Sequence, residues 1–259
     1  MSRDGTRGKL GVYLKRLKLP SFAADHEALA KAAEEGSWSF EGYLAELCER
    51  EVADRQERRI ERLLRQSGLP LEKTRETLIE KNLPVKARRQ LAALYEGTFL
   101  ERAENVLAFG LPGRGKTHAL CAVGHELVRQ GHAVLFVPAY LLVQRLLVAK
   151  RELLLDRALK RLDRFEAVLI DDIGYVQQDR EEMEVLFTFL SARYERRSVM
   201  ITSNLVFSQW EKIFKDPMTT ACAIDRLVHH ASILELTGPS YRAEAAKQRT
   251  KALAKVATS

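Results

Sequence analysis

The sequence predicts an α/β protein with a mostly parallel sheet covered by helices, preceded by a small all-helical N-terminal domain. From Asn105 onward, short β-branched or apolar runs alternate with helical stretches, as in strands joined by crossover helices. Before Gly68, apolar residues instead recur at three- and four-residue spacing, which is typical of amphipathic helices. A chain of 259 residues is long enough to form both parts.

The helical domain is expected to span residues 1–68. Its first helix ends before Pro20, and the apolar residues that define it are Leu10, Tyr13, Leu14 and Leu17. A second, long helix is expected from Phe40 to Gln66, capped by the segment before it. Gly68 in the stretch QSGLP ends that helix.

A connecting region is expected over residues 69–104, with one more helix at about Lys86–Tyr95. The core domain then covers residues 105–259. Its predicted strands are Val106–Phe109, Ala133–Val137, Ala167–Ile170, Ser198–Thr202 and Ser232–Leu236.

Composition narrows the setting and the partners. The formal net charge is +7 and the pI is about 9.3, so an acidic polymer such as nucleic acid is one expected partner. No apolar run approaches the roughly 20 residues that span a bilayer, so no membrane association is expected. The three widely spaced cysteines indicate no disulfide framework, and we expect a cytoplasmic protein.

A phosphate-binding loop is the clearest motif. Gly110 to Thr117 fits G-x-x-x-x-G-K-[ST], in which backbone N–H groups converge on phosphate oxygens at a helix N-terminus. Lys116 can reach the β- and γ-phosphates, and the Thr117 hydroxyl can bind Mg²⁺. His118 is counted with the loop, although its position is also typical of a packed or solvent-facing residue. The expected nucleotide contacts are Gly110, Pro112, Gly113, Arg114, Gly115, Lys116, Thr117 and His118.

Two acids end the apolar run AVLIDDIG. Asp171 at the end of a core strand can hold the metal ion together with Thr117, and Asp172 can polarise the attacking water. In isolation, two acids after a strand are also common in solvated turns. Their position after a core-type strand, downstream of the phosphate loop, favours the functional interpretation.

Two later stretches complete the candidate site. In SVMITSN, the polar residues Thr202, Ser203 and Asn204 end a buried strand. Of these, Asn204 is the candidate for orienting the attacking water. The alternative is a turn at the strand end in which the Asn side chain bonds to its own backbone. In AIDRLVHHA, Arg226 can neutralise charge in a neighbouring subunit's site, or can be an ordinary surface arginine. The adjacent histidines 229 and 230 are expected to diverge on a helix and not to chelate together.

Taken together, GLPGRGKTHA, VLIDDIGY, VMITSNLVFSQW, AIDRLVHHA and GPSYR resemble the IstB-type transposition helper ATPases of bacterial insertion sequences. These are similar to the DnaC helicase loaders and the DnaA initiators, within the AAA+ ATPases. The resemblance implies a three-layer AAA+ core that hydrolyses ATP with Mg²⁺. It also implies homo-oligomers on double-stranded DNA that recruit and stimulate a transposase.

The resemblance also assigns roles by position. Gly110–Thr117 matches Walker A, Asp171 and Asp172 match Walker B, and Asn204 matches sensor I. Arg226 falls at the arginine-finger-like position, and Arg242 in SYR is the candidate second sensor.

The sequence departs from the family pattern in two places. Many AAA+ proteins have Glu where this chain has Asp172, whose shorter side chain suggests slow hydrolysis. The segment Thr77–Leu83 lacks the aromatic residues expected near adenine.

DNA phosphate contacts are expected from the basic N-terminal helix and from a second basic stretch, which contains Arg145, Lys150, Arg151, Arg157, Lys160, Arg161 and Arg164. Both stretches can also be plain solvated helix faces. A DnaC-like helicase loader and a nucleotide-gated scaffold with little turnover stay open as alternatives. A small-molecule P-loop kinase is disfavoured by the two acids, the sensor Asn and the lack of an obvious substrate lid.

Overall fold

The computed structural model describes residues 3–175, 179–214, 216–237 and 240. The chain divides into two compact units, residues 1–62 and 63–259, which are described here one at a time. Among the described residues, none of the helices combines the length and the apolarity that crossing a bilayer demands.

The N-terminal unit is all-helical. It consists of α1 (Arg3–Arg16), α2 (Pro20–Glu35) and most of α3 (Phe40–Ser67). The sequence predicted the first and third helices but missed α2. Pro20 begins this helix instead of only ending the one before it, because a proline at the first helical position needs no N–H partner.

The N-terminus of α2 is held by acids of α3. The backbone N–H of Ser21 donates to Glu51 Oε2 at 2.9 Å, and its hydroxyl donates to Asp54 Oδ2 at 2.6 Å. Leu14, Leu29 and the α3 residue Leu47 are buried. Polar bonds at the helix start and the burial of these three leucines together stabilise the unit.

The second unit begins with short connecting elements and then forms the sheet. The connecting elements are η1 (Glu80–Asn82), α4 (Val85–Tyr95) and η2 (Thr98–Leu100), so the helix predicted at Lys86–Tyr95 is confirmed. The strands are β1 (Asn105–Phe109), β2 (Val134–Pro138), β3 (Ala167–Asp171), β4 (Ser198–Ser203) and β5 (Ala231–Glu235). Each lies within one residue of its predicted limits.

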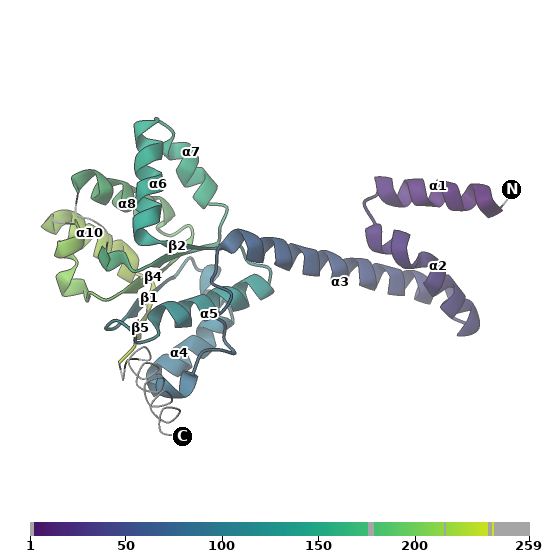
Figure 1. Cartoon of the computed structure of the whole chain (residues 1–259), viewed down its shortest axis with the longest axis horizontal. Helices are drawn as coiled ribbons and strands as arrows, with labels where there is room; N and C mark the ends of the chain where they lie inside the picture. Colours follow the sequence, from purple (N-terminus) through teal and green to yellow (C-terminus); the bar gives the residue numbers. More distant parts are fainter. Residues whose placement is uncertain (1–2, 176–178, 215, 238–239, 241–259) are drawn as a thin grey trace, which may run out of the picture. The chain divides into compact units, whose positions relative to one another are not determined.

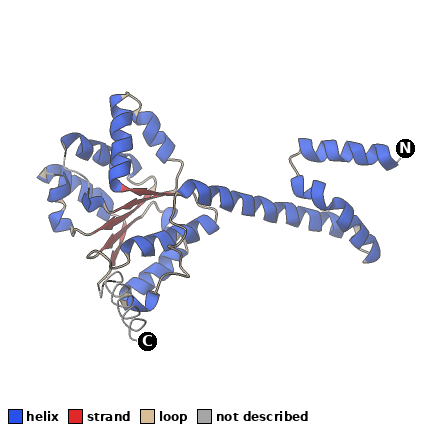
Figure 2. Ribbon diagram, in the orientation of Figure 1, coloured by secondary structure: helices blue, strands red, loops and turns tan. Residues whose placement is uncertain are grey.

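All five strands are parallel, in the order β2-β3-β4-β1-β5. Helices α5 (Lys116–Arg129) and α4 cover one face, and α6 (Ala139–Arg151) and α8 (Arg180–Arg193) cover the other (Figures 1 and 2). Packed beside these are α7 (Leu155–Leu162), η3 (Ile173–Tyr175), η4 (Phe207–Gln209), α9 (Glu211–Phe214) and α10 (Pro217–Val228). The predicted three-layer α/β core is therefore confirmed.

A buried arginine ties the amino ends of the strands to the loops around them. Arg193 is 1% exposed, and its guanidinium donates to the carbonyls of Phe165 and Ser198 at 3.0 Å each. Burial lowers its pKa to about 10, an effect that nearby Asp163 partly opposes. The polar residues at the strand ends lie at the opposite, carboxyl edge of the sheet. Open parallel sheets bind their ligands at that edge.

Candidate functional site

The phosphate loop connects the buried strand β1 to helix α5. Gly113 and Gly115 have φ values of 80° and 86°, in the left-handed region that side chains with a Cβ rarely adopt. A Cβ on Gly110 would collide with the carbonyl oxygen of Leu236 on the neighbouring strand segment. The glycines therefore allow a tight loop whose N–H groups and following helix N-terminus suit a phosphate.

Lys116 folds back over this loop. Its Nζ donates to the carbonyls of Gly110 at 2.7 Å and Leu111 at 3.2 Å, and the residue is 8% exposed. The ammonium group is thus held at the loop, within the site predicted for the phosphates.

Asp171, at the end of β3, is the centre of a hydroxyl–carboxylate cluster. Its Oδ1 accepts hydrogen bonds from the hydroxyls of Thr117 and Thr202, each at 2.7 Å. The same Thr202 oxygen accepts the N–H of Asp172 at 2.7 Å. Hydroxyl and carboxylate oxygens beside a phosphate loop are the hard donors that Mg²⁺ prefers, so Thr117 and Asp171 fit that ion.

Asp172 and Asn204 lie next to this cluster. Asp172 has a φ of 60°, a left-handed conformation that is uncommon for a residue with a side chain and recurs at functional sites. The buried Oδ1 of Asn204 has no hydrogen-bond partner among the described residues. A Cβ on Gly174 would collide with that oxygen, so the glycine is what allows Asn204 to lie there.

The residue before Asn204 has a different role. The hydroxyl of Ser203 donates to the Leu205 carbonyl at 2.7 Å and accepts the Leu205 N–H at 3.0 Å. Ser203 therefore stabilises the turn after β4, whereas Thr202 and Asn204 face the site.

A cavity of about 310 Å³ joins these residues. Lys73, Arg114 and Lys116 line it with positive charge, and Asp172 is the acidic residue of the lining. This excess of positive charge suits a polyphosphate. The lining residues are Lys73, Thr77, Leu78, Ile79, Pro112, Gly113, Arg114, Gly115, Lys116, Thr117, His118, Asp172, Thr202 and Asn204. The structure thus brings together the loop, Asp172 and Asn204 as the sequence predicted, with Asp171 directly behind Thr117.

His118 links the connecting region to the phosphate loop. Its Nε2 lies 3.0 Å from Thr77 Oγ1 and 3.1 Å from the Thr74 carbonyl, and burial lowers the pKa of this half-buried imidazole. It therefore holds the pocket wall formed by Thr77, Leu78 and Ile79. That wall is aliphatic, so a base bound there would contact Leu78 and Ile79 instead of an aromatic ring.

Sequence reasoning missed part of this wall and the full role of Thr202. The pattern SVMITSN indicates Thr202 as a candidate, but its bonds to Asp171 and Asp172 depend on strand pairing. No sequence pattern predicts that Lys73 lines the cavity. Only the family resemblance draws attention to the segment that begins at Thr77.

Arg226 lies outside the cavity of its own chain. It is in the last turn of α10, where its guanidinium donates to the Ser191 hydroxyl and lies 4.9 Å from the Phe187 ring centroid. Arg242 lies outside the described residues.

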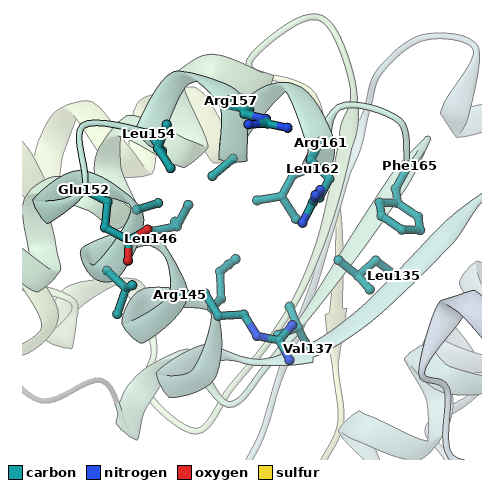
Figure 3. A pocket seen from close by; sticks show the side chains of 14 residues that line it. Leu135, Val137, Arg145, Leu146, Glu152, Leu154, Arg157, Arg161, Leu162 and Phe165 are labelled. Carbon is teal, nitrogen blue, oxygen red and sulfur yellow. The ribbon is translucent and has the colours of Figure 1, made fainter.

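The second predicted basic stretch, on α6 and α7, surrounds a different cavity of about 600 Å³ (Figure 3). Its walls are mostly aliphatic, and the exposed residues Arg145, Arg157 and Arg161 stand around them. These three arginines and Arg164 make no ion pair with any described residue. By contrast, Lys150, Arg151 and Lys160 pair with Glu184, Glu181 and Asp156, respectively.

Known proteins resemble this chain over most of its length. The sequence model of the family described as IstB-like ATP binding protein matches residues 12–252. An insertion sequence ATP-binding protein of Sinorhizobium fredii is 42% identical over 241 residues, covering 93% of this chain and 81% of the relative. The IS21 ATP-binding protein of Pseudomonas aeruginosa is 37% identical over 237 residues, covering 90% and 88%.

The solved structure of DnaI resembles the fold, with a TM-score of 0.55 and 20% identity, over 66% of this chain and 96% of that one. The AAA+ fold class and the family resemblance that the sequence predicted are both confirmed.

Proposed function

The chain belongs to the IstB-like ATP-binding protein family, and from this premise we propose that it is an ATP-hydrolysing helper of transposition. In this proposal it assembles as a homo-oligomer on double-stranded DNA and recruits and stimulates a transposase. The names of its relatives associate them with insertion sequences and with ATP. These names support the proposal of an ATP-dependent helper of transposition.

The observation that carries hydrolysis, beyond binding, is that Asp172 and Asn204 line the same cavity as the phosphate loop. Lys116 leaves its loop carbonyls to contact the terminal phosphates, and Asn204 orients the attacking water. Asp172 accepts a proton from that water, although its reach is about one methylene shorter than that of a glutamate. Mg²⁺ bound at Thr117 and Asp171 supplies charge neutralisation of the phosphates.

Arg226 is proposed to act on the nucleotide of a neighbouring subunit. Within its own chain the guanidinium lies on α8, away from the cavity, so any role in phosphate chemistry requires a second copy. An arginine supplied in this way stabilises the charge of the transition state and makes hydrolysis depend on assembly.

DNA is proposed to contact cations that pair with no acidic side chain among the residues that the structure describes. On α6, on α7 and in the turn that follows α7, these are Arg145, Arg157, Arg161 and Arg164, as described above. On the N-terminal unit, Lys9, Lys15, Arg16 and Lys18 are exposed. Such contacts bind phosphates without reading the base sequence.

The test is the steady-state ATPase rate of the full chain with and without duplex DNA, for the wild type and for Asp172→Asn. We expect duplex DNA to raise the wild-type rate and the substitution to remove most of the turnover while ATP still binds. A rate that is insensitive to both DNA and the substitution would indicate a nucleotide-gated scaffold and would refute the hydrolysis proposal.

The partner needs a separate measurement. We expect the chain with ATP and DNA to retain a transposase encoded beside it and to stimulate strand transfer by that enzyme. Retention of a replicative helicase instead of a transposase would refute this part and would indicate a helicase loader.

A further inference from the structure

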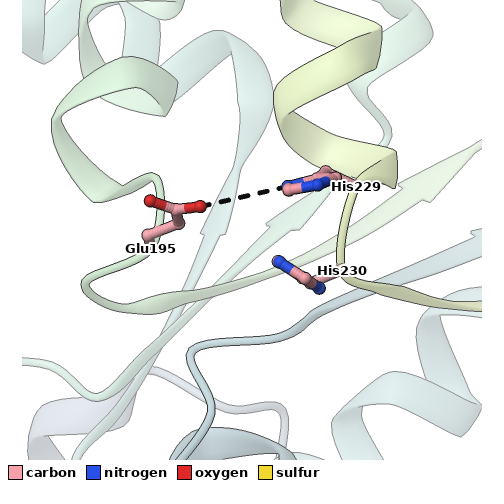
Figure 4. A group of neighbouring side chains, drawn as sticks. All are labelled: Glu195, His229 and His230. Carbon is pink, nitrogen blue, oxygen red and sulfur yellow. Dashed lines mark ion pairs between the residues drawn. The ribbon is translucent and has the colours of Figure 1, made fainter.

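Glu195, His229 and His230 converge on the surface at the amino edge of the sheet, opposite the nucleotide cavity (Figure 4). Glu195 lies in the turn between α8 and β4, and the histidines connect α10 to β5. One carboxylate oxygen and one nitrogen from each ring all lie within 4.8 Å of one another. No other group of three such side chains converges in the part of the chain that the structure describes.

The expectation that the two histidines diverge on a helix is wrong. Helix α10 ends at Val228, so helical geometry does not separate them, and their ring centroids lie 4.1 Å apart. The prediction placed both histidines within the helix, whereas the helix ends just before them.

Neighbouring contacts orient the cluster. The Tyr194 hydroxyl lies 2.9 Å from His229 Nδ1, and Oε1 of Glu195 lies 3.9 Å from the same nitrogen. Glu195 has a φ of 54°, so the turn adopts the left-handed conformation at the residue that carries the carboxylate. The ring and the carboxylate therefore face each other across two segments of the chain.

We propose that Glu195, His229 and His230 form a binding site for a divalent transition-metal ion, with Zn²⁺ as the best match. Imidazole nitrogens suit Zn²⁺, Cu²⁺ and Ni²⁺, whereas Mg²⁺ and Ca²⁺ prefer sites made only of oxygen. Zinc bonds of about 2.0–2.2 Å bring tetrahedral ligand atoms to roughly 3.3–3.6 Å from one another. All three side chains are exposed, so rotation about their own bonds can close the remaining gap. Solvent supplies the fourth ligand.

A bound ion would fasten the end of α10 to the turn that follows α8. Arg226 precedes His229 by one helical turn and contacts Ser191 and Phe187 of α8. The ion therefore restrains the helix that carries this arginine. An effect on hydrolysis rests on the function proposed above for Arg226, whereas metal binding does not.

The experiment is a calorimetric titration of the untagged full chain with Zn²⁺ alone, without nucleotide or DNA. Millimolar Mg²⁺ in the buffer occupies oxygen-only sites. The parent protein carries Cys48→Ser and Cys222→Ser, because both thiols are exposed and thiolates are themselves good zinc ligands. We expect one ion per chain, and at least about tenfold weaker binding after Glu195→Gln or His230→Asn.

The matched control is His26→Asn. His26 also lies beside a glutamate, with Nε2 4.0 Å from Glu27, but it belongs to no group of three. We expect this variant to bind Zn²⁺ as the parent does, and we expect Zn²⁺ to raise the thermal midpoint of the parent but not of His230→Asn. The proposal is overturned if the parent binds no ion, if Glu195→Gln and His230→Asn bind as tightly as the parent, or if His26→Asn weakens binding equally. Because no ATP is present, these outcomes are independent of whether the protein hydrolyses it.

Discussion

Replacing Thr202 with valine removes one oxygen from the centre of the candidate site and leaves its shape nearly unchanged. The Thr202 side chain is fully buried. Its hydroxyl donates to Asp171 Oδ1 and accepts the N–H of Asp172, both at 2.7 Å. Valine keeps the branched shape, so the substitution opens no sizeable cavity and tests the two hydrogen bonds almost alone.

The expected loss follows from these two bonds. A hydrogen bond to a charged group contributes about 1.5–3 kcal/mol and a neutral one about 0.5–1.5 kcal/mol. We therefore expect Thr202→Val to lower the free energy of unfolding of the core by about 3 kcal/mol. For a domain of this size, that corresponds to a fall in the thermal midpoint of roughly 6–12 °C.

The test compares the thermal midpoints of Thr202→Val and Thr202→Ser, measured side by side, and shows how much the Thr202 hydroxyl stabilises the core. Serine keeps the hydroxyl and loses only a methyl group, which costs about 1 kcal/mol. We also expect serine to keep most of the ATPase activity and valine to lose it, because Asp171 and Asp172 lose a shared anchor. If the two variants unfold at the same temperature, the hydroxyl contributes no more than the methyl group, about 1 kcal/mol, and the reasoning about this cluster is wrong.

Three further perturbations test other parts of the molecule. Arg226→Ala should lower hydrolysis at high protein concentration by roughly 10³-fold or more and leave ATP affinity unchanged; normal turnover would exclude the trans role. Burial alone would raise the pKa of Glu51, but hydrogen bonds from a neighbouring arginine and from two N–H groups at the start of α2 outweigh it and hold the pKa below its ordinary value. The ionised Glu51 carboxylate therefore stabilises the folded state fully above about pH 4.5, and this contribution is lost as the pH falls through the folded-state pKa. In denaturant titrations, the difference in free energy of unfolding between wild type and Glu51→Gln should therefore shrink between pH 6 and pH 3. Removing Arg157 and Arg161 together should reduce the salt slope of DNA binding by about 2, whereas removing the ion-paired Lys160 should leave it unchanged. A fall of about 1 on removing Lys160 would show that the three cations contact DNA alike, and an unchanged slope in both variants would show that none of them does.

Local patterns determined much of this protein. Burial along a strand and glycine spacing are properties of a few neighbouring residues, so the five strands, the loop ending at Thr117 and the acid pair at the end of β3 could be predicted directly. Helix α2 could not, because a start at Pro20 looks like an end. Few of its residues are large and apolar, and its N-terminus is held by Glu51, thirty positions away.

The tertiary structure alone decided which distant residues meet. Ile170 pairs with Ile201 across β3 and β4, and this register places the next residues, Asp171 and Thr202, in hydrogen-bonding contact. Packing likewise set His118 against Thr77 and placed Arg226 on α8, away from its own nucleotide cavity. The sequence by itself fixes which chemical groups stand at the strand ends. The distances between them depend on strand register and helix ends, which are set by the packing of the whole core.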